Sequence, residues 1–254
     1  MAKLIFLGTA SAVAFEGHEN TYMVLQGDKS SILIDCAAKP LLQLKKTGIH
    51  FNDLSDLVIT HFHADHVSGL ANLLMDMWIL GRQTKFCIHG SQHSISRAET
   101  MMGLFEWDTW KNMYPVSFHT IPLIESSLVL ENSEFKIHSS PVEHLIPTLG
   151  LRIENLENGF VAAYSSDTNP VEQMVRLAAG ADVLIHEAGG SFQGHSTSAE
   201  AGEIASQAQA GKLYLIHYSM YGGKTAASII SGAADTFPGE VVLAEDLMEI
   251  EFRK

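Results

Sequence analysis

The chain reads Leu57-Val58-Ile59-Thr60-His61-Phe62-His63-Ala64-Asp65-His66 at the point where an apolar run meets a cluster of metal-binding side chains. Residues 57–60 have the composition of a buried strand, and residues 67–80 have the pattern of a helix. The histidines and the aspartate therefore lie in a strand-to-helix loop, where a rigid scaffold can present side chains. Imidazoles beside a carboxylate suit Zn²⁺ or a similar first-row divalent ion. The stretch predicts a metal site at the end of a strand.

The length and composition indicate an ordinary globular protein. The chain has 254 residues, of which 46% are hydrophobic and 18% are charged, and it shows no linker, repeat or low-complexity tract. We therefore expect a single domain over residues 1–254 with ample core. There is no run of 18 apolar residues, so no membrane span is expected. The opening eight residues are too short and too strand-like for a signal peptide.

The two cysteines, Cys36 and Cys87, are far apart and outside any Cys-x-x-Cys pattern. Each follows an apolar run, so we expect two buried thiols rather than a disulfide or metal ligands. Unpaired thiols are typical of a reducing compartment, which predicts a cytoplasmic protein. The net charge of −13 makes nucleic acid a disfavoured partner, because its binding depends largely on Lys and Arg that neutralise phosphates.

Strand-like runs and helical patterns alternate through most of the chain. The predicted strands cover 3–7, 22–25, 31–35, 57–60, 85–89, several short segments of 115–164, 182–186, 212–217, 240–243 and 248–252. The predicted helices cover 40–47, 67–80, 91–113, 170–179, 198–209 and 225–235. This order fits two sheets with helices on the outside.

The segment 101–113 is rich in methionine and aromatic residues, including Trp107 and Trp110. Such a cluster is most simply part of the core or of a packing surface. The alternative is an exposed apolar patch, either at the lip of a substrate pocket or on a dimer face.

Three more metal-binding side chains follow apolar runs, namely His144, Asp167 and His217. A single such residue at a strand end is usually capped or solvated, but the cluster at 61–66 needs partners from elsewhere. All seven residues together can hold two metals that share one carboxylate. Two ions about 3.5–4 Å apart can hold a bridging water and lower its pKa.

With these residues in order, the chain resembles the metallo-β-lactamase superfamily from residue 4 to about residue 250. His61-x-His63-x-Asp65-His66 matches the superfamily signature. The resemblance implies an αββα sandwich, an α/β fold of two mixed sheets flanked by helices. It also implies a binuclear site for two Zn²⁺ ions, with Mn²⁺ or Fe as alternatives. His61, His63 and His144 would hold one ion, Asp65, His66 and His217 the other, and Asp167 would bridge them.

Two further stretches are similar to the ribonuclease Z-like branch of this superfamily. They are Ile185-His186-Glu187-Ala188 and Gly194-His195-Ser196-Thr197, and the opening Leu7-Gly8-Thr9-Ala10-Ser11 is similar as well. The resemblance makes His195 a catalytic residue that assists proton transfer near the scissile phosphate. Read alone, His195 is a residue of a helix-entry loop, and Glu187 either orients it or is simply a buried, hydrogen-bonded carboxylate.

The remaining histidines have no motif partner, and we expect them to be structural or exposed to solvent. His18 is the exception, because its loop approaches the metals in the superfamily and could contact substrate. The others are His50, His89, His93, His119 and His138.

The chain departs from ribonuclease Z in one respect. Many of those enzymes carry an inserted arm that grips tRNA, and in many of them the arm lies in the sequence between the counterparts of His144 and Asp167. Here the residues between those two positions leave room only for two strands and a turn. Short relatives without the arm resemble phosphodiesterases of small esters. We therefore predict a zinc-dependent hydrolase of a small or cyclic phosphate ester that acts through a metal-bridging hydroxide, with Asp65 positioning the nucleophile.

Other functions stay open. The first alternative is a tRNA 3′-end endoribonuclease, and the second is a sulfate-ester, thioester or lactone hydrolase of the same superfamily. A non-enzymatic metal-binding sensory module is a third, although all seven ligand positions are intact. The expected partners are a small anionic ester and a second copy of the chain in a homodimer.

Overall fold

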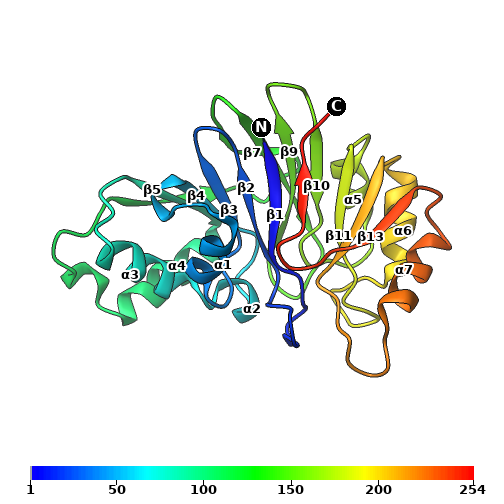
Figure 1. Cartoon of the computed structure of the whole chain (residues 1–254), viewed down its shortest axis with the longest axis horizontal. Helices are drawn as coiled ribbons and strands as arrows, with labels where there is room; N and C mark the ends of the chain where they lie inside the picture. The colour runs from blue at the N-terminus through cyan, green and yellow to red at the C-terminus, as the bar shows by residue number, and fades with distance from the viewer. Residues whose placement is uncertain (1) are drawn as a thin grey trace.

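The structure is a computed structural model that describes residues 2–254, and it contains two seven-stranded sheets packed face to face (Figure 1). Both sheets are mixed, because each combines antiparallel pairs with parallel ones. Helices cover the outer face of each sheet. The predicted αββα sandwich is confirmed.

The first sheet contains the amino-terminal strands and the last strand of the chain. Its order is β14 (Glu249–Glu251), β1 (Lys3–Gly8), β2 (Tyr22–Gln26), β3 (Ser31–Ile34), β4 (Leu54–Ile59), β5 (Phe86–Ser91) and β6 (Val116–Ile121). The helices α1 (Pro40–Thr47), α3 (Leu70–Ile79) and α4 (Gln92–Leu104) pack on its outer face, and η1 (Phe51–Asp53) leads into β4.

The second sheet continues from the centre of the chain. Its order is β13 (Glu240–Leu243), β12 (Lys212–Ile216), β11 (Val183–Glu187), β10 (Val161–Tyr164), β9 (Thr148–Asn155), β8 (Phe135–Val142) and β7 (Ser127–Glu131). Its outer face is covered by α5 (Glu172–Ala178), α6 (Ser198–Gln207) and α7 (Ala226–Ala234).

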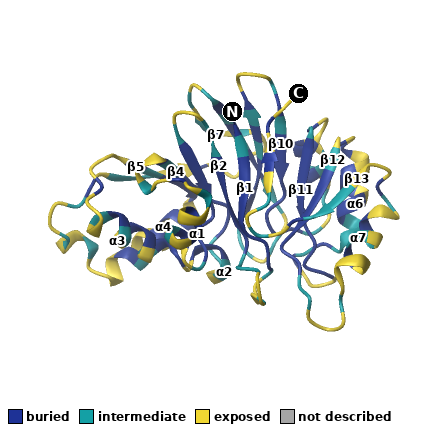
Figure 2. Ribbon diagram, in the orientation of Figure 1, coloured by how far each residue is buried: buried dark blue, intermediate teal, exposed yellow. Residues whose placement is uncertain are grey.

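Strand alternation divides the apolar residues between the layers. In β1, Leu4 and Phe6 lie in the core between the two sheets, whereas Ile5 and Leu7 pack toward the first set of helices. Both sets are buried because the sheet is covered on both faces, and Figure 2 shows the strands mostly in dark blue. This core fixes the strand ends from which the site is built.

The prediction of one helix over 67–80 is wrong. The chain forms a short helix α2 (Ala64–Val67), then α3, with Ser68 and Gly69 between them. Gly69 approaches α1 so closely that a Cβ atom would lie 2.7 Å from Pro40 Cδ and 2.8 Å from the Ala37 carbonyl oxygen. Its N–H donates to the Cys36 carbonyl instead of continuing the helix begun by α2. Asp65 consequently lies in a helix rather than in a loop.

The prediction of a helix through 91–113 is correct only to Leu104, where α4 ends. Glu106 and Asn112 have φ values of 50° and 58°, which an α-helix does not tolerate, and only the short η2 (Trp107–Thr109) follows. The expected packing role of 101–113 holds for most of its methionine and aromatic residues, which lie in or against the core on the helix side of the first sheet, namely Met101, Met102, Trp107, Trp110 and Met113. Leu104 and Phe105 are 80% and 55% exposed and form an apolar patch on the surface.

Both cysteines are free. Cys36 is buried as predicted, but Cys87 is only half-buried, because it lies on the face of β5 opposite to the helices. Among residues 2–254, no helix has both the length and the apolar character that a membrane crossing requires.

Candidate metal centre

The seven predicted ligands converge at one end of the two sheets. His61, His144, Asp167 and His217 each follow a strand, namely β4, β8, β10 and β12. Asp65 and His66 belong to α2, which begins directly after His63 and lies at this end of the molecule (Figure 1). The structure therefore brings together side chains that are up to about 150 residues apart in the chain.

The side chains form two neighbouring groups. His61, His63 and His144 each offer a ligand atom, and these atoms lie within 4.8 Å of one another. The nitrogens His144 Nε2 and His63 Nδ1 are 3.0 Å apart. Three imidazoles converging in this way could hold one metal ion.

The second group combines Asp65, His66, Asp167 and His217, again with ligand atoms within 4.8 Å of one another. Asp65 Oδ2 lies 3.3 Å from His217 Nε2 and 3.5 Å from His66 Nε2. This second group could hold another metal ion.

Asp167 lies between the two groups. Its Oδ2 atom is 3.7 Å from His61 Nε2 on one side, and on the other it is 3.4 Å from His66 Nε2 and 3.3 Å from His217 Nε2. Burial by itself raises the pKa of Asp167, but the surrounding imidazoles outweigh burial and hold that pKa well below its usual range. This favours the ionised form of the carboxylate, which lies between the two groups.

The donor set fits divalent metals. The atoms His61 Nε2, His66 Nε2 and Asp167 Oδ1 are buried and have no hydrogen-bond partner among the described residues, which is costly unless an ion or water satisfies them. Metal–ligand bonds of about 2.0–2.2 Å put two ligands of a tetrahedral ion about 3.4 Å apart, as found here.

Buried hydrogen bonds orient these histidines. Asp35 Oδ2 accepts from His66 Nδ1 at 2.9 Å, and Asp35 Oδ1 accepts from the Thr60 N–H at 2.8 Å. His144 Nδ1 donates to the Gly194 carbonyl at 2.6 Å. Holding Nδ1 leaves Nε2 free for an ion and fixes the ring. Asp35 is not among the predicted site residues, although it directly follows an apolar strand, which is the pattern that points to Asp167.

Three residues at this end of the sheets adopt left-handed backbone conformations that non-glycine residues rarely adopt. Asp35, Ser166 and His217 have φ values of 60°, 53° and 52°. Each such residue costs of order 1–3 kcal/mol and persists only where its surroundings demand it. These strained residues lie just after β3, β10 and β12, where the chain enters the candidate site.

His195 and Glu187 form a pair beside the metal ligands. Glu187 is fully buried, and its carboxylate accepts from His195 Nδ1 at 3.0 Å, from the Ser196 N–H at 2.9 Å and from the Gly189 N–H at 2.6 Å. The His195 ring stacks on that of His217 with centroids 5.5 Å apart. Burial lowers the pKa of His195, but the bond to Glu187 and the nearby carboxylates outweigh burial, so its pKa is raised overall.

A cavity of about 590 Å³ opens beside this pair. Its lining combines His195 and His217 with exposed apolar or aromatic side chains, namely Val13, Leu145, Phe192 and Tyr221. The volume lies within the range of pockets for small molecules. The two histidines form the polar part of the cavity, and the apolar and aromatic side chains form its rim.

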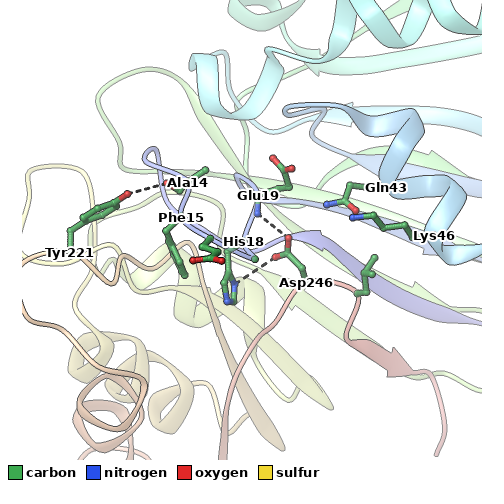
Figure 3. Close-up of a pocket in the computed structure, with 11 residues that line it drawn as sticks. Ala14, Phe15, His18, Glu19, Gln43, Lys46, Tyr221 and Asp246 are labelled. Atoms are coloured by element: carbon green, nitrogen blue, oxygen red, sulfur yellow. Dashed lines mark hydrogen bonds and ion pairs between the residues drawn. The ribbon is translucent and has the colours of Figure 1, made fainter.

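The structure places His18 in a different cavity from His195. His18 Nδ1 is hydrogen-bonded to Thr9 Oγ1 at 2.8 Å, and Thr9 Oγ1 donates to Asp246 at 2.7 Å. Figure 3 shows His18 beside Asp246 in a cavity whose wall includes Gln43 and Lys46 of α1. Tyr221 lines both cavities, so the loop of His18 adjoins the candidate site without adding His18 to it.

Comparisons with known proteins agree with this geometry. The sequence model of the family described as "Anti-Pycsar protein Apyc1" matches residues 2–230. Ribonuclease Z of Methanothermobacter thermautotrophicus is 26% identical over 309 aligned positions, covering 100% of this chain and 97% of that protein.

Solved structures are similar over the same length. The metallo-β-lactamase fold protein YhfI of Bacillus subtilis is 22% identical with a TM-score of 0.82, and 98% of each chain is covered. The short form of human tRNase Z is 25% identical with a TM-score of 0.80, covering 99% of this chain and 100% of that one.

The names of these relatives bear out the predicted class, a metal-dependent hydrolase of phosphate esters. They favour the ribonuclease Z alternative over the small-ester prediction, since the curated relatives are called Ribonuclease Z. The chain belongs to the family of anti-Pycsar protein Apyc1, within the ribonuclease Z-like branch of the metallo-β-lactamase superfamily.

Proposed function

We propose that this chain is a phosphodiesterase with two metal ions that cleaves a small or cyclic phosphate ester. The observation that carries the proposal is the cavity in which His195 and His217 share a space of about 590 Å³ with apolar side chains. A phosphate at the polar end would leave the apolar part of a small ester against Phe192 and Tyr221. Stacking of a base on such an aromatic ring contributes about 1–3 kcal/mol.

The proposed ligands are divided between two ions, with Zn²⁺ as the metal and Mn²⁺ or Fe as alternatives. His61, His63 and His144 would hold one ion, Asp65, His66 and His217 the other, and Asp167 would contact both. When bound, such ions activate water at neutral pH and stabilise negative charge on phosphate oxygens.

The side chains around the ions would perform the proton transfers. Asp65 would orient the attacking water, whose oxygen forms the new bond to phosphorus. His195 would donate a proton from Nε2 to the leaving oxygen as its bond to phosphorus breaks. Glu187 would act as a positioning residue, because its hydrogen bond to Nδ1 keeps Nε2 directed away from it.

The connection between β9 and β10 supports a small substrate. Here the chain passes from Asn155 to Val161 in a tight turn, in which Glu157 N–H donates to Asn155 Oδ1 at 2.8 Å. An alignment of 309 positions with a ribonuclease Z holds only the 254 residues of this chain, so that relative carries additional residues. A net charge of −13 further disfavours a polyanionic substrate.

Cleavage of RNA is the second candidate, and the names of the curated relatives favour it. The two candidates share the phosphodiester bond and the metal centre. They differ in whether the surface outside the cavity grips a polynucleotide.

An assay with three substrates separates the candidates. The protein, loaded with Zn²⁺, is given bis-p-nitrophenyl phosphate, a cyclic nucleotide and a precursor tRNA. We expect turnover of the two small esters and little cleavage of the tRNA. Rapid cleavage at the tRNA 3′ end with poor turnover of the small esters would replace the small-ester proposal by the ribonuclease one.

Variants in the same assay test the metal centre. Asp167→Ala should abolish turnover of all three substrates while the protein stays folded, whereas a matched change at the exposed Asp235 should not. Normal turnover by Asp167→Ala contradicts the two-metal proposal.

Phe192→Ala should raise KM for the cyclic nucleotide more than for bis-p-nitrophenyl phosphate.

We also propose that residues 1–254 act as one hydrolase domain, that the protein is cytoplasmic, and that it forms a homodimer. The two free thiols support the compartment. The exposed apolar side chains of Leu104 and Phe105 support an interface.

A further inference from the structure

Four chemically reactive side chains gather on three neighbouring strands of the first sheet, outside the catalytic centre. Asp56 of β4 lies opposite Cys87 of β5, and His89 of β5 lies opposite His119 of β6. Cys87 and His89 are two residues apart on one strand and therefore point to the same face. The other face of β4 and β5, with Leu57 and Ile88, packs against the helices.

The side chains are already in contact with one another. His89 Nε2 is 2.7 Å from Asp56 Oδ1, and the ligand atoms of Asp56, Cys87 and His89 lie within 4.8 Å of one another. The His89 and His119 rings stack with centroids 4.9 Å apart. The Ser117 hydroxyl donates to Cys87 Sγ at 3.4 Å and is 2.9 Å from His119 Nε2, so it joins the thiol to the second imidazole.

One buried atom in this cluster has no partner. His89 is only 7% exposed, and its Nδ1 atom has no hydrogen bond among the described residues. A carboxylate on one imidazole nitrogen with the other nitrogen unsatisfied is the arrangement found where histidine binds a metal. Burying the His89 Nδ1 atom without a hydrogen-bond partner is costly, so this position favours a ligand that binds Nδ1.

We propose that Cys87, His89 and the adjacent His119 form a separate binding site for a single Zn²⁺ or similar transition-metal ion, in which Asp56 orients the His89 ring through its contact with Nε2. Thiolate and imidazole donors select borderline and soft metals, whereas Ca²⁺ and Mg²⁺ prefer oxygen ligands. The thiol loses its proton to solvent when the ion binds. The ion would tie the edge strand β6 to β5.

This site is separate from the catalytic centre. Asp56 and Cys87 lie in the amino-terminal halves of their strands, whereas His61 follows the carboxyl end of β4. The catalytic groups contain only nitrogen and oxygen donors, so sulfur coordination distinguishes the two sites. A failure of the hydrolase proposal would leave this site unaffected.

Titration of the metal-free full-length protein with Co²⁺ tests the site, because thiolate coordination produces a near-ultraviolet charge-transfer band that nitrogen and oxygen ligands do not. We expect the band in the wild type and its loss in Cys87→Ser. Cys36→Ala is the matched control and should retain the band, since Cys36 is buried in the core on the helix side of the sheet.

His119→Ala provides a second test in a variant that should fold, because the His119 side chain is exposed. Loss of one of the ligands should weaken Co²⁺ binding at this site at least about tenfold, because mutation of even an outer-shell partner of a ligand typically costs about 10–100-fold. Turnover of a phosphodiester by Cys87→Ser loaded with two equivalents of Zn²⁺ should equal that of the wild type. Absence of a thiolate band in the wild type, or its persistence in Cys87→Ser, overturns the proposal, as does unchanged affinity in His119→Ala.

Discussion

Asp35 is the residue whose contribution the structure most clearly reveals. It is fully buried, and it accepts hydrogen bonds from both the backbone and the side chain of Thr60 as well as from His66. It therefore connects the end of β3 to the end of β4 and to α2. A carboxylate suits this position because every partner donates.

Asp35→Asn should reduce metal affinity and kcat/KM by about 10–100-fold. An asparagine has only one acceptor oxygen, so its amide group would face one of the donors that the carboxylate satisfies. Metal content by mass spectrometry and steady-state kinetics would measure the loss. Asp235→Asn on the surface is the control, and equal behaviour of the two variants would exclude the role assigned to Asp35.

At the scale of elements, the break between α2 and α3 determines where Asp65 and His66 lie. Gly69→Ala should destabilise the protein by about 1–3 kcal/mol, because the added Cβ meets Pro40 and the Ala37 carbonyl. The shift of α2 that relieves the contact should also lower activity.

Gly103→Ala in α4 is the matched control. A Cβ there meets nothing within 4 Å, so the substitution should stabilise the helix by about 0.5–1 kcal/mol. Urea unfolding of both variants measures the difference. A neutral Gly69→Ala would show that the segment joining α2 and α3 can move away from Pro40 and Ala37 at little cost.

The contact between the loop after β1 and the loop before β14 should depend on pH. Burial is the largest influence on Asp246 and raises its pKa above the ordinary 3.8, against the lowering effect of hydrogen bonds from Glu19 N–H and Thr9. A raised carboxyl pKa means that the folded protein binds the proton more tightly. Stability therefore falls as the pH rises through the folded pKa and is recovered below 3.8.

Asp246→Asn should be more stable than the wild type at pH 7, and the advantage should shrink as the pH approaches 3.8. Asparagine can accept from the Glu19 N–H and donate to Thr9 Oγ1, so both contacts are retained. Thermal melts of the metal-free proteins across this range measure the effect. An advantage that does not change with pH would contradict the assignment to Asp246.

At the scale of the whole molecule, the patch formed by Leu104 and Phe105 is the surface we expect to mediate self-association. Replacing both residues by Asp should convert a dimer to a monomer, because burying two carboxylates at an apolar interface is unfavourable. Light scattering after gel filtration measures the mass. Ile124→Asp, at a turn where the side chain is 67% exposed, should leave the mass unchanged. A dimer that survives the double substitution places the interface elsewhere.

Much of the fold could be predicted from the sequence, because the signals are local. The helix Pro40–Thr47 and the strand Glu240–Leu243 have the bounds that were expected, and most other elements agree to within a few residues. The long predicted helices failed at Gly69 and Glu106. Both breaks depend on contacts or backbone conformations that apolar periodicity does not register.

The sequence by itself determined the type of site, since His61-x-His63-x-Asp65-His66 is a local motif and the later candidates each end an apolar strand. Only the tertiary structure decided which side chains meet. Asp35 reaches His66 because α2 packs beside the end of β3. Glu187 reaches His195 because the loop after β11 folds back on that strand. Cys87 lies beside Asp56 because β4 and β5 are neighbours in a sheet. Strand pairing joins residues at sequence separations that no local pattern records, and for that reason the supporting contacts became visible only in the folded chain.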